Sequence, residues 1–201
     1  MTLPRFEDVT DIDALAEALD AADHDERVKW IRRLGEKAQR RLYEMAEGRP
    51  VDLEELVGDD GELVRHVGKN GLPLFNRFEK CFARLGDQVV GYNRNNWIVQ
   101  LVTGPGHYLA YPSPNRPGEI WIDYRRLPTV QHPDVPPLRS NERGIPALVF
   151  GNMVDVLRRV SKHVTIGDAF KNFDREEPQL PVLVRVGAAL PTAPFVLCRA
   201  P

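Results

Sequence analysis

The sequence predicts an α+β fold in which helices come first and a curved antiparallel β-sheet or small β-barrel follows. Helical spacing of apolar residues predominates up to residue 85, and short alternating runs of β-prone residues begin after Gly86. Of the 17 prolines, 14 lie at or after position 105, which favours short strands over long helices there. The chain is accordingly divided into a helical hairpin at 1–48 and a main domain at 49–201.

Two helices are expected in the hairpin. The first spans residues 12–22, where Thr10 or Asp11 can act as the N-cap. The second spans residues 25–46 and ends before Gly48. Its apolar residues are spaced three or four apart and form one continuous stripe: Ile31, Leu34, Ala38, Leu42 and Met45.

Charge is sorted between these two helices. Residues 7–25 carry eight acidic side chains and no Lys or Arg, whereas residues 26–41 carry seven bases against two acids. Because an antiparallel hairpin would place the two segments side by side, we expect the acidic segment to neutralise the basic one. The alternatives are a basic surface for nucleic acid or a membrane, and a charged face that joins two copies of the chain or binds a protein partner.

Residues 49–71 are expected to form a connector with a short helix at 52–57, and a further helix is expected at 73–85. Pro73 suits the first turn of that helix. One helical face would carry four apolar residues: Leu74, Phe78, Phe82 and Leu85. Two Phe on such a face are more typical of a core than of a ligand site.

A meander of antiparallel strands is expected next. Alternation over Trp97–Tyr111, interrupted by the turn sequence Gly104-Pro105-Gly106, predicts a β-hairpin. A third strand is expected over Glu119–Tyr124. Helices followed by short consecutive strands resemble the lipocalin-like small β-barrels in architecture, and this resemblance implies a strongly curved or closed sheet.

The rest of the chain predicts one long irregular segment and several short strands. Five prolines make residues 126–146 irregular, and a loop of this length is expected to be functional or to cover a sheet face or a cavity. Residues 147–150 are strand-like, and residues 153–160 fit either a helix or a strand. Further strands are expected at three places: Val164–Phe170, Val182–Val186 and Phe195–Cys198.

Composition indicates a globular cytoplasmic protein that acts without nucleic acid. The chain of 201 residues has a net charge of -2, which gives no general attraction to nucleic acid or to anionic membranes. Its two cysteines, Cys81 and Cys198, are expected to be free thiols in a reducing cytoplasm. No segment approaches the roughly 20 apolar residues of a transmembrane helix, and residues 1–15 lack the pattern of a signal peptide.

The sequence contains no recognisable catalytic or cofactor motif. The five histidines show no metal-ligand spacing, so no metal is expected. Gly104-Pro105-Gly106 lacks the Lys-Ser/Thr ending and the following helix of a phosphate loop, so it is interpreted as a turn. We therefore expect no cofactor.

A mixture of aromatic and polar side chains supplies the candidate ligand-binding residues. They lie mostly on the expected meander: Tyr92, Trp97, His107, Tyr108, Trp121, Asp123, Tyr124 and Arg143. Tyr and Trp combine an apolar body with a polar tip, which suits the lining of a small-molecule cavity. Cross-strand aromatic pairs in an ordinary core would give the same pattern. Arg143 is included because it could join other arginines around an anionic head group.

The leading functional expectation is a non-catalytic protein that binds a small hydrophobic ligand or lipid in a β-lined cavity. The first alternative is an enzyme of the isomerase or cyclase type in the same cavity, with His107 paired with Asp123 or with Tyr124 for acid–base chemistry. The second alternative is a protein–protein interaction module that uses the charged helical hairpin.

Overall fold

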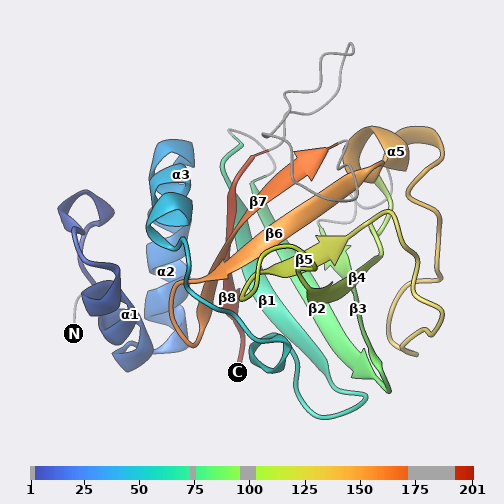
Figure 1. Cartoon of the computed structure of the whole chain (residues 1–201), viewed down its shortest axis with the longest axis horizontal. Coiled ribbons are helices and arrows are strands. Elements are labelled where there is room, and N and C mark those ends of the chain that lie inside the picture. Colours follow the sequence, from blue (N-terminus) through green and yellow to red (C-terminus); the bar gives the residue numbers. More distant parts are fainter. Residues whose placement is uncertain (1–2, 73–75, 96–102, 172–192) are drawn as a thin grey trace.

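The chain folds as three N-terminal helices followed by a closed eight-stranded antiparallel β-barrel, as the sequence predicts for the fold class (Figure 1). This computed structural model describes residues 3–72, 76–95, 103–171 and 193–201. The strands follow one another around the barrel in sequence order, and β8 pairs with β1 to close it. Their bounds are β1 Leu63–Asn70, β2 Arg77–Leu85, β3 Gln88–Arg94, β4 Tyr108–Pro112, β5 Ile120–Asp123, β6 Met153–Arg159, β7 Val164–Lys171 and β8 Phe195–Arg199.

The helices are short. Their bounds are α1 Ile12–Ala21, α2 His24–Arg33, α3 Glu36–Met45 and α5 Gly144–Phe150, with 3₁₀ turns η1 Phe6–Asp8 and η2 Leu53–Glu55. The first helix begins as predicted, with the Asp11 carboxylate accepting hydrogen bonds from the backbone N–H groups of Asp13 and Ala14. In the part of the chain that the structure describes, no helix has the length and apolar composition that a membrane span requires.

The single long helix predicted at 25–46 is in fact two helices, α2 and α3, separated at Leu34 and Gly35. The apolar stripe runs across the break, which is why spacing alone does not show it. The break leaves the carbonyl of Leu34 available, and it accepts hydrogen bonds from Lys69 Nζ at 2.6 Å and from Gln39 Nε2 at 3.0 Å. These two side chains satisfy the carbonyl that a continuous helix would have bonded internally.

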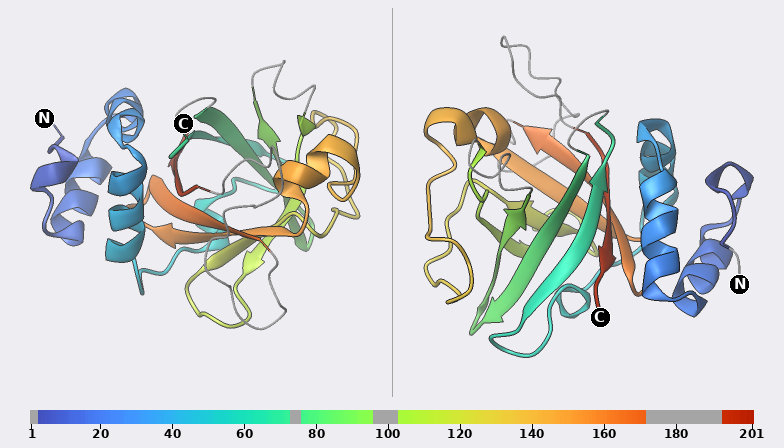
Figure 2. Two further views of the ribbon diagram at one scale, coloured as in Figure 1. Left: turned by 90° about the horizontal axis from the view of Figure 1, so that it is seen from above. Right: turned by 180° about the vertical axis from the view of Figure 1, so that it is seen from behind.

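Helices α2 and α3 form a layer on the outer face of the barrel beside β7, β8 and β1, and α1 lies on the side of this layer away from the barrel (Figure 2). An apolar cluster joins the two parts. It includes Leu15, Trp30, Ile31 and Leu42 from the helices and Val164, Ile166, Val196 and Cys198 from the barrel. A buried ion pair at the edge of this layer adds a polar anchor, because Arg158 bonds Glu119 at 2.8 Å and the backbone carbonyl of Tyr43 in α3 at 2.9 Å.

The expected neutralisation of the basic helix by its acidic neighbour does not take the form of direct ion pairs. Among the described residues, no ion pair joins an acid of 7–25 to a base of 26–41. Arg27 and Arg41 instead donate to backbone carbonyls, and Arg40 bonds Glu36 on its own helix. Apolar contacts with the barrel hold the helices in place. The separation of acidic and basic residues along the chain therefore does not hold the helices together through ion pairs.

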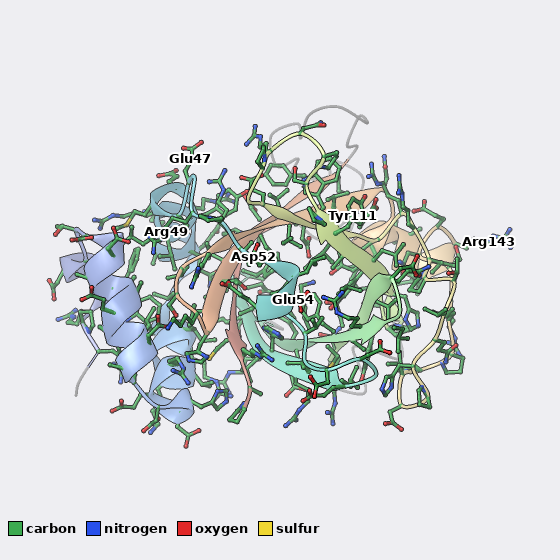
Figure 3. The ribbon with its side chains drawn as sticks, turned by 60° about the horizontal axis from the view of Figure 1, so that its bottom comes forward. Glu47, Arg49, Asp52, Glu54, Tyr111 and Arg143 are labelled. Atoms are coloured by element: carbon green, nitrogen blue, oxygen red, sulfur yellow. The ribbon has the colours of Figure 1, made fainter. Side chains whose placement is uncertain are left out.

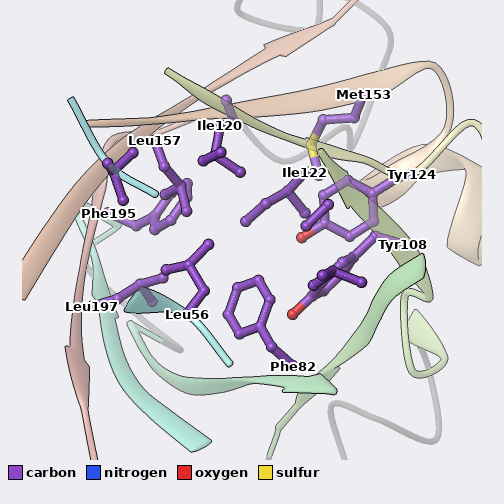
Figure 4. Packing of buried hydrophobic residues seen from close by; sticks show 14 of the residues in the cluster. Leu56, Phe82, Tyr108, Ile120, Ile122, Tyr124, Met153, Leu157, Phe195 and Leu197 are labelled. Atoms are coloured by element: carbon purple, nitrogen blue, oxygen red, sulfur yellow. The ribbon is translucent and has the colours of Figure 1, made fainter. Parts of the chain in front are cut away.

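The barrel interior is filled by side chains that alternate along each strand (Figure 4). Its apolar members include Leu56, Phe82, Tyr108, Ile120, Ile122, Leu157, Phe195 and Leu197. Leu56, which follows the η2 turn, contributes from one end, and Phe150 of α5 contributes from the other. The core of the main domain is therefore the inside of the barrel itself.

The two ends of the barrel differ in the length of their connections. At one end the strands are joined by residues 86–87, 113–119 and 160–163. At the other end the connections are residues 71–76, 95–107, 124–152 and 172–194. We call this second end the loop-rich end.

The helix predicted at 73–85 is wrong, because residues 77–85 form β2, and residues 73–75 lie outside the described part of the chain. Residues four apart share a face of a helix and also share a face of a strand, whose side chains repeat every two residues. Phe78 and Phe82 therefore satisfy both patterns. Lys80, between them, points to the same side of β2 as they do, into the barrel.

Three other assignments change. Residues 63–70, expected in the connector, form β1, whose alternation is obscured by the buried His66. Residues 147–150, expected as a strand, belong to α5, where Pro146 suits the first turn of a helix. Residues 153–160, for which the pattern fits two structures, are largely strand β6, and they look ambiguous because both faces of that strand are buried.

The predicted meander is partly outside the described residues. Residues 97–102 of its first arm and the strand predicted at 182–186 are not described. The second arm is β4, which pairs with β3 on one side and β5 on the other. Three predicted strands are confirmed: residues 119–124 as β5, 164–170 as β7 and 195–198 as β8.

The proline-rich segment at 126–146 lies over the outer face of the barrel. Covering a sheet face was one of the possibilities that its length predicted. Val135 packs against Cys81 of β2 and Tyr92 of β3. A ring nitrogen of His132 is 2.9 Å from the carbonyl of Gly61, which fixes the segment to the turn before β1. The segment therefore covers the barrel wall, and its far end leads into α5 at the loop-rich end.

Asp168 on β7 provides a test of the interface with the helices. It is 6% exposed, and the Arg40 guanidinium lies 3.7 Å from its carboxylate. Burial raises the pKa of Asp168 from 3.8 to about 6, although Arg40 opposes this shift. Because the folded state binds this proton more tightly than the unfolded chain does, the group lowers stability as pH rises from about 4 through 6.

We expect Asp168→Asn to be about 1–3 kcal/mol more stable than the parent at pH 7 in urea unfolding, with no difference below about pH 4.

His66 acts in the opposite direction. Burial lowers its pKa from 6.5 to about 4, although its hydrogen bond with the Leu56 carbonyl opposes this shift. The unfolded chain then binds the proton first, so this group lowers stability as pH falls from about 6.5 towards 4. The Asp168→Asn protein should therefore lose stability in acid more steeply than the parent. Asp87→Asn, on an exposed turn, is the matched control, and equal pH profiles for all three proteins would contradict the prediction.

Candidate functional site

Four polar side chains meet inside the barrel: Lys80, Asn93, Tyr124 and Asp155. We call them the interior polar cluster. Lys80 Nζ is 2.9 Å from Asp155 Oδ2 and 2.9 Å from Asn93 Oδ1, and it donates a short hydrogen bond to the Tyr124 hydroxyl. That hydroxyl is 3.2 Å from Asp155 Oδ2. All four residues are between 2% and 4% exposed, so the cluster is a buried ion pair with its own hydrogen-bond network.

The strand order explains how these residues meet. Lys80 is on β2 and Asp155 is on β6, which stand four places apart in a closed ring of eight, on opposite walls. The ion pair therefore crosses the interior of the barrel. Lys80 and Asp155 are near the first residues of their strands, Asn93 is near the last residue of β3, and Tyr124 follows β5. All four positions belong to the loop-rich end.

Aromatic rings surround the amine of Lys80. Its Nζ lies 5.0 Å from the ring centres of Tyr124 and Phe195, 5.2 Å from that of Tyr108 and 5.7 Å from that of Phe78. Tyr108 and Tyr124 also pack edge to face at 5.4 Å, with both hydroxyls pointing inward (Figure 4). Ring faces attract cations, so this site favours a positive charge at the position of the nitrogen.

Burial and pairing act against each other on the charges of the cluster. Burial lowers the pKa of Lys80, and the Asp155 carboxylate raises it in part. Burial also raises the pKa of Asp155, and Lys80 opposes that shift. Both directions bring the amine and the carboxyl closer to sharing one proton, as a neutral amine and a neutral acid. The pKa of Tyr124 is raised, chiefly by burial, so its hydroxyl stays protonated.

This arrangement offers three chemical capacities. An ammonium–carboxylate pair can hydrogen-bond the polar group of a ligand. A neutral buried lysine is a nucleophile towards carbonyl carbon. Tyr124, in contact with both Lys80 and Asp155, can pass a proton between them or to a bound molecule.

Gly106 supports the cluster from the loop between β3 and β4. Its backbone has φ +55, and its carbonyl is 3.4 Å from Asn93 Nδ2. A Cβ added here would lie 2.8 Å from Asn93 Nδ2 and 2.6 Å from the Phe150 ring. The Gly-Pro-Gly sequence therefore allows the loop backbone to approach the site closely.

Replacing Gly106 by Ala should lower the free energy of unfolding by about 1–3 kcal/mol, because the side chain adds both backbone strain and steric clash. Urea unfolding measures the effect. Gly35→Ala is the matched control, since a Cβ there would meet nothing within 4 Å and its φ is -77. Equal stabilities of the two variants would contradict the close approach at Gly106.

The structure separates the predicted site residues into interior and exterior groups. Tyr108 and Tyr124 point into the barrel and adjoin Lys80. The others lie elsewhere: Tyr92 and Trp121 on the outer face, Asp123 in an outer ion pair, His107 beneath the proline-rich segment, and Arg143 exposed before α5. Figure 3 shows Arg143 pointing away from the barrel. Trp97 is outside the described residues.

His107 and Asp123 do not form the expected acid–base pair. A ring nitrogen of His107 lies 3.2 Å from the Pro137 carbonyl. Asp123 accepts hydrogen bonds from Tyr111 at 2.6 Å and from Arg125 at 2.8 Å. No hydrogen bond joins the two within the described chain. Both side chains serve to attach loops to the outer wall of the barrel.

Sequence reasoning missed Lys80 and Asp155 as members of a site. The available signal was Phe78-Glu79-Lys80-Cys81-Phe82, in which a lysine occupies an apolar face if the segment is a strand. A similar signal is Asp155 between the valines of β6. A charge on an apolar strand face is unusual, because burying it requires a partner.

A hollow of about 350 Å3 lies at the loop-rich end of β1, β2 and β3, and the residues that line it include Arg32 of α2 and the outward-pointing Val67 and Arg77. Its lining includes Gly68, Phe78, Glu79 and Arg94. Phe78 belongs to both places, because its ring also faces Lys80. A larger groove of about 710 Å3 lies elsewhere, beside the C-terminal residues, and is lined by charges of both signs.

Comparison with known proteins adds no information about this site. No family model, curated protein or solved structure matches the chain. No group of three His, Cys, Asp or Glu side chains comes together among the residues described, as a metal site would require. The geometry of the cluster is therefore the basis for any functional conclusion.

Proposed function

We propose that this protein binds a small, largely apolar ligand at the loop-rich end of the barrel, with the ligand's polar group against Lys80. The observation that carries the proposal is the buried Lys80–Asp155 pair in an interior otherwise lined by apolar and aromatic side chains. The ligand-binding class is the same as that expected from the sequence. The residues are largely different.

The cost of burying these charges supports a functional role. A buried ion pair of this kind contributes little net stability compared with apolar residues that fill the same volume. Asp155 and Lys80 lie directly above closely packed apolar side chains, with Phe82 and Ile122 fully buried. Ionisable groups with shifted pKa values in such positions are characteristic of functional sites.

The location of the cluster supports the same proposal. An eight-stranded barrel has an interior just wide enough for side chains or for one small ligand. The hollow beside Phe78 has a volume of about 350 Å3, within the range of small-molecule sites. Phe78 lines this hollow and its ring also faces Lys80, so we propose that a ligand reaches the amine by displacing that ring. Both thiols of the chain are buried and free, as suits the reducing cytoplasm where we place the protein.

Native mass spectrometry of the purified full chain tests this proposal. We expect a small molecule to co-purify with the parent and to be lost in Lys80→Met, which removes the amine but keeps an apolar chain. Lys29→Met, on the exposed face of α2, is the matched control and should keep the ligand. Equal ligand occupancy in all three proteins would contradict a site at Lys80.

Acid–base catalysis in the same site is a second candidate, favoured by the contact of the Tyr124 hydroxyl with both Lys80 and Asp155. Such a set could move a proton next to a carbonyl group. Cyclohexanone in D2O is a suitable probe, because NMR reports deuterium exchange at the carbons beside its carbonyl. Catalysed exchange that Tyr124→Phe abolishes would favour this candidate, and exchange at the uncatalysed rate would exclude it for this probe.

A further inference from the structure

We propose that Lys80 binds its ligand covalently, as an imine formed with an aldehyde or ketone. This inference rests on the proposed function, since it names the chemical class of the ligand for the same site. It is carried by the position of one amine among a carboxylate, a tyrosine hydroxyl and four aromatic rings.

The hydrogen bonds of Lys80 suit both the free and the bound state. An ammonium group has three N–H donors, and Lys80 has three acceptors: Asp155, Asn93 and the Tyr124 hydroxyl. A protonated imine keeps a single N–H. The Asp155 carboxylate, at 2.9 Å, can accept it, which leaves Asn93 and Tyr124 to bond the rest of the ligand or the departing water.

The charge of the site is also the same in both states. A protonated imine carries one positive charge at nitrogen, as the ammonium does. The rings of Tyr108, Tyr124 and Phe195, at 5.0 to 5.2 Å from Nζ, are placed to stabilise either cation. Imine formation therefore replaces one paired cation by another in the same apolar surroundings.

The reaction balances with the groups present. Lys80 first gives one proton to Asp155 and becomes a neutral amine. Its nitrogen attacks the carbonyl carbon, a C–N bond forms, and the carbonyl oxygen receives a proton through Tyr124 or Asp155. A proton then passes from the nitrogen to this hydroxyl through Asp155, the C–O bond breaks, and the departing water leaves the C=N bond. In total, an ammonium and an aldehyde give a protonated imine and water, with Asp155 ending as the carboxylate.

Burial supports the first step, because it lowers the pKa of Lys80 and so raises the fraction of neutral amine. Two other lysines are partly or wholly buried, but their surroundings differ. Lys69 Nζ donates to the Leu34 carbonyl at 2.6 Å, and Lys171 Nζ donates to the Leu148 carbonyl at 2.7 Å. Neither has a carboxylate within ion-pair distance among the described residues, so neither has a partner for an imine cation.

Reductive trapping tests the inference on the full-length chain. The protein is incubated with a limiting amount of hexanal and sodium cyanoborohydride, which reduces an imine to a stable secondary amine by delivering hydride to its carbon. Intact mass and peptide mapping then locate the added hexyl group. We expect Lys80 to be labelled to saturation and more strongly than the mean of the other lysines. At a fixed pH, each unit by which the pKa of Lys80 lies below theirs raises its fraction of neutral amine about tenfold.

Lys80→Arg is the decisive variant, because it keeps a cation opposite Asp155 but cannot form an imine. It should lose the saturable label and retain the fold by circular dichroism. Lys69→Arg and Lys171→Arg are the matched controls and should label as the parent does.

The non-reactive analogue 1-hexanol separates this inference from the proposed function. If hexanol binds the parent in native mass spectrometry while Lys80 remains unlabelled by hexanal, the imine is excluded and ligand binding stands. If neither binds nor labels, both proposals are overturned for this ligand class. Labelling spread evenly over the exposed lysines would also exclude a dedicated imine at Lys80.

Discussion

Replacing Asp155 by Leu is expected to lower the free energy of unfolding by about 3–5 kcal/mol, because it leaves the Lys80 ammonium buried without its countercharge. Lys80 is 2% exposed, so its side chain does not extend its amine into solvent as a surface lysine does. Urea unfolding followed by circular dichroism and fluorescence measures the loss. The same substitution should leave Lys80 with a lower pKa than in the parent.

The double variant Lys80→Met with Asp155→Leu should recover most or all of this stability, since apolar residues can replace a buried ion pair at little cost. The two single variants and the double variant form a thermodynamic cycle that gives the coupling energy. Glu7→Gln, in an exposed pair with Arg5, is the matched control and should change stability by less than about 1 kcal/mol. A double variant that is as unstable as Asp155→Leu alone would show that the cluster is needed for folding. That result would count against the proposal that the ion pair is kept for ligand binding.

Replacing Phe82 by Ala is expected to cost about 3–5 kcal/mol, because it removes a fully buried ring from the barrel interior. The ring packs 5.4 Å from that of Tyr108 and 5.0 Å from that of His66, so the loss leaves a cavity between three strands. Urea unfolding gives the free energy, and a melting curve gives an independent check.

Phe82→Leu is the control for this prediction, since it keeps an apolar side chain and should cost clearly less. A matched pair on the same strand sharpens the test. Phe78, nearer the loop-rich end, is only half-buried, so Phe78→Ala should cost less than Phe82→Ala. Equal losses at the two positions would contradict the description of a closed core beneath an accessible end.

The fold class follows from local patterns, and the structure confirms it. Helix α1 has its cap, and β5, β7 and β8 have β-prone residues between turn signals, so each element is encoded within its own segment. The segments assigned to the wrong element are those whose apolar spacing fits more than one kind of secondary structure. In β2 the spacing of Phe78 and Phe82 fits both a helix and a strand, and only the pairing with β1 and β3 decides between them.

The interior polar cluster could be predicted only in part, for a different reason. Tyr108 and Tyr124 were candidates because their residue type suits a cavity, and both lie beside Lys80. The pairing of Lys80 with Asp155 depends on which strands face each other across the closed barrel. That relation is set by the number of strands and their register, and no local pattern in either strand contains it.

Closure of the barrel also governs how the chain can acquire its structure. β1 is the first strand to be synthesised, yet one of its edges pairs only with β8, the last. Until β8 has left the ribosome, that edge presents unpaired backbone N–H and C=O groups, which are a template for aggregation. Because the β1–β8 contact joins segments so distant in sequence, its formation is expected to be a late event in folding. Kinetic studies should therefore find that changes in β8, such as Leu197→Ala, accelerate unfolding more than they slow folding.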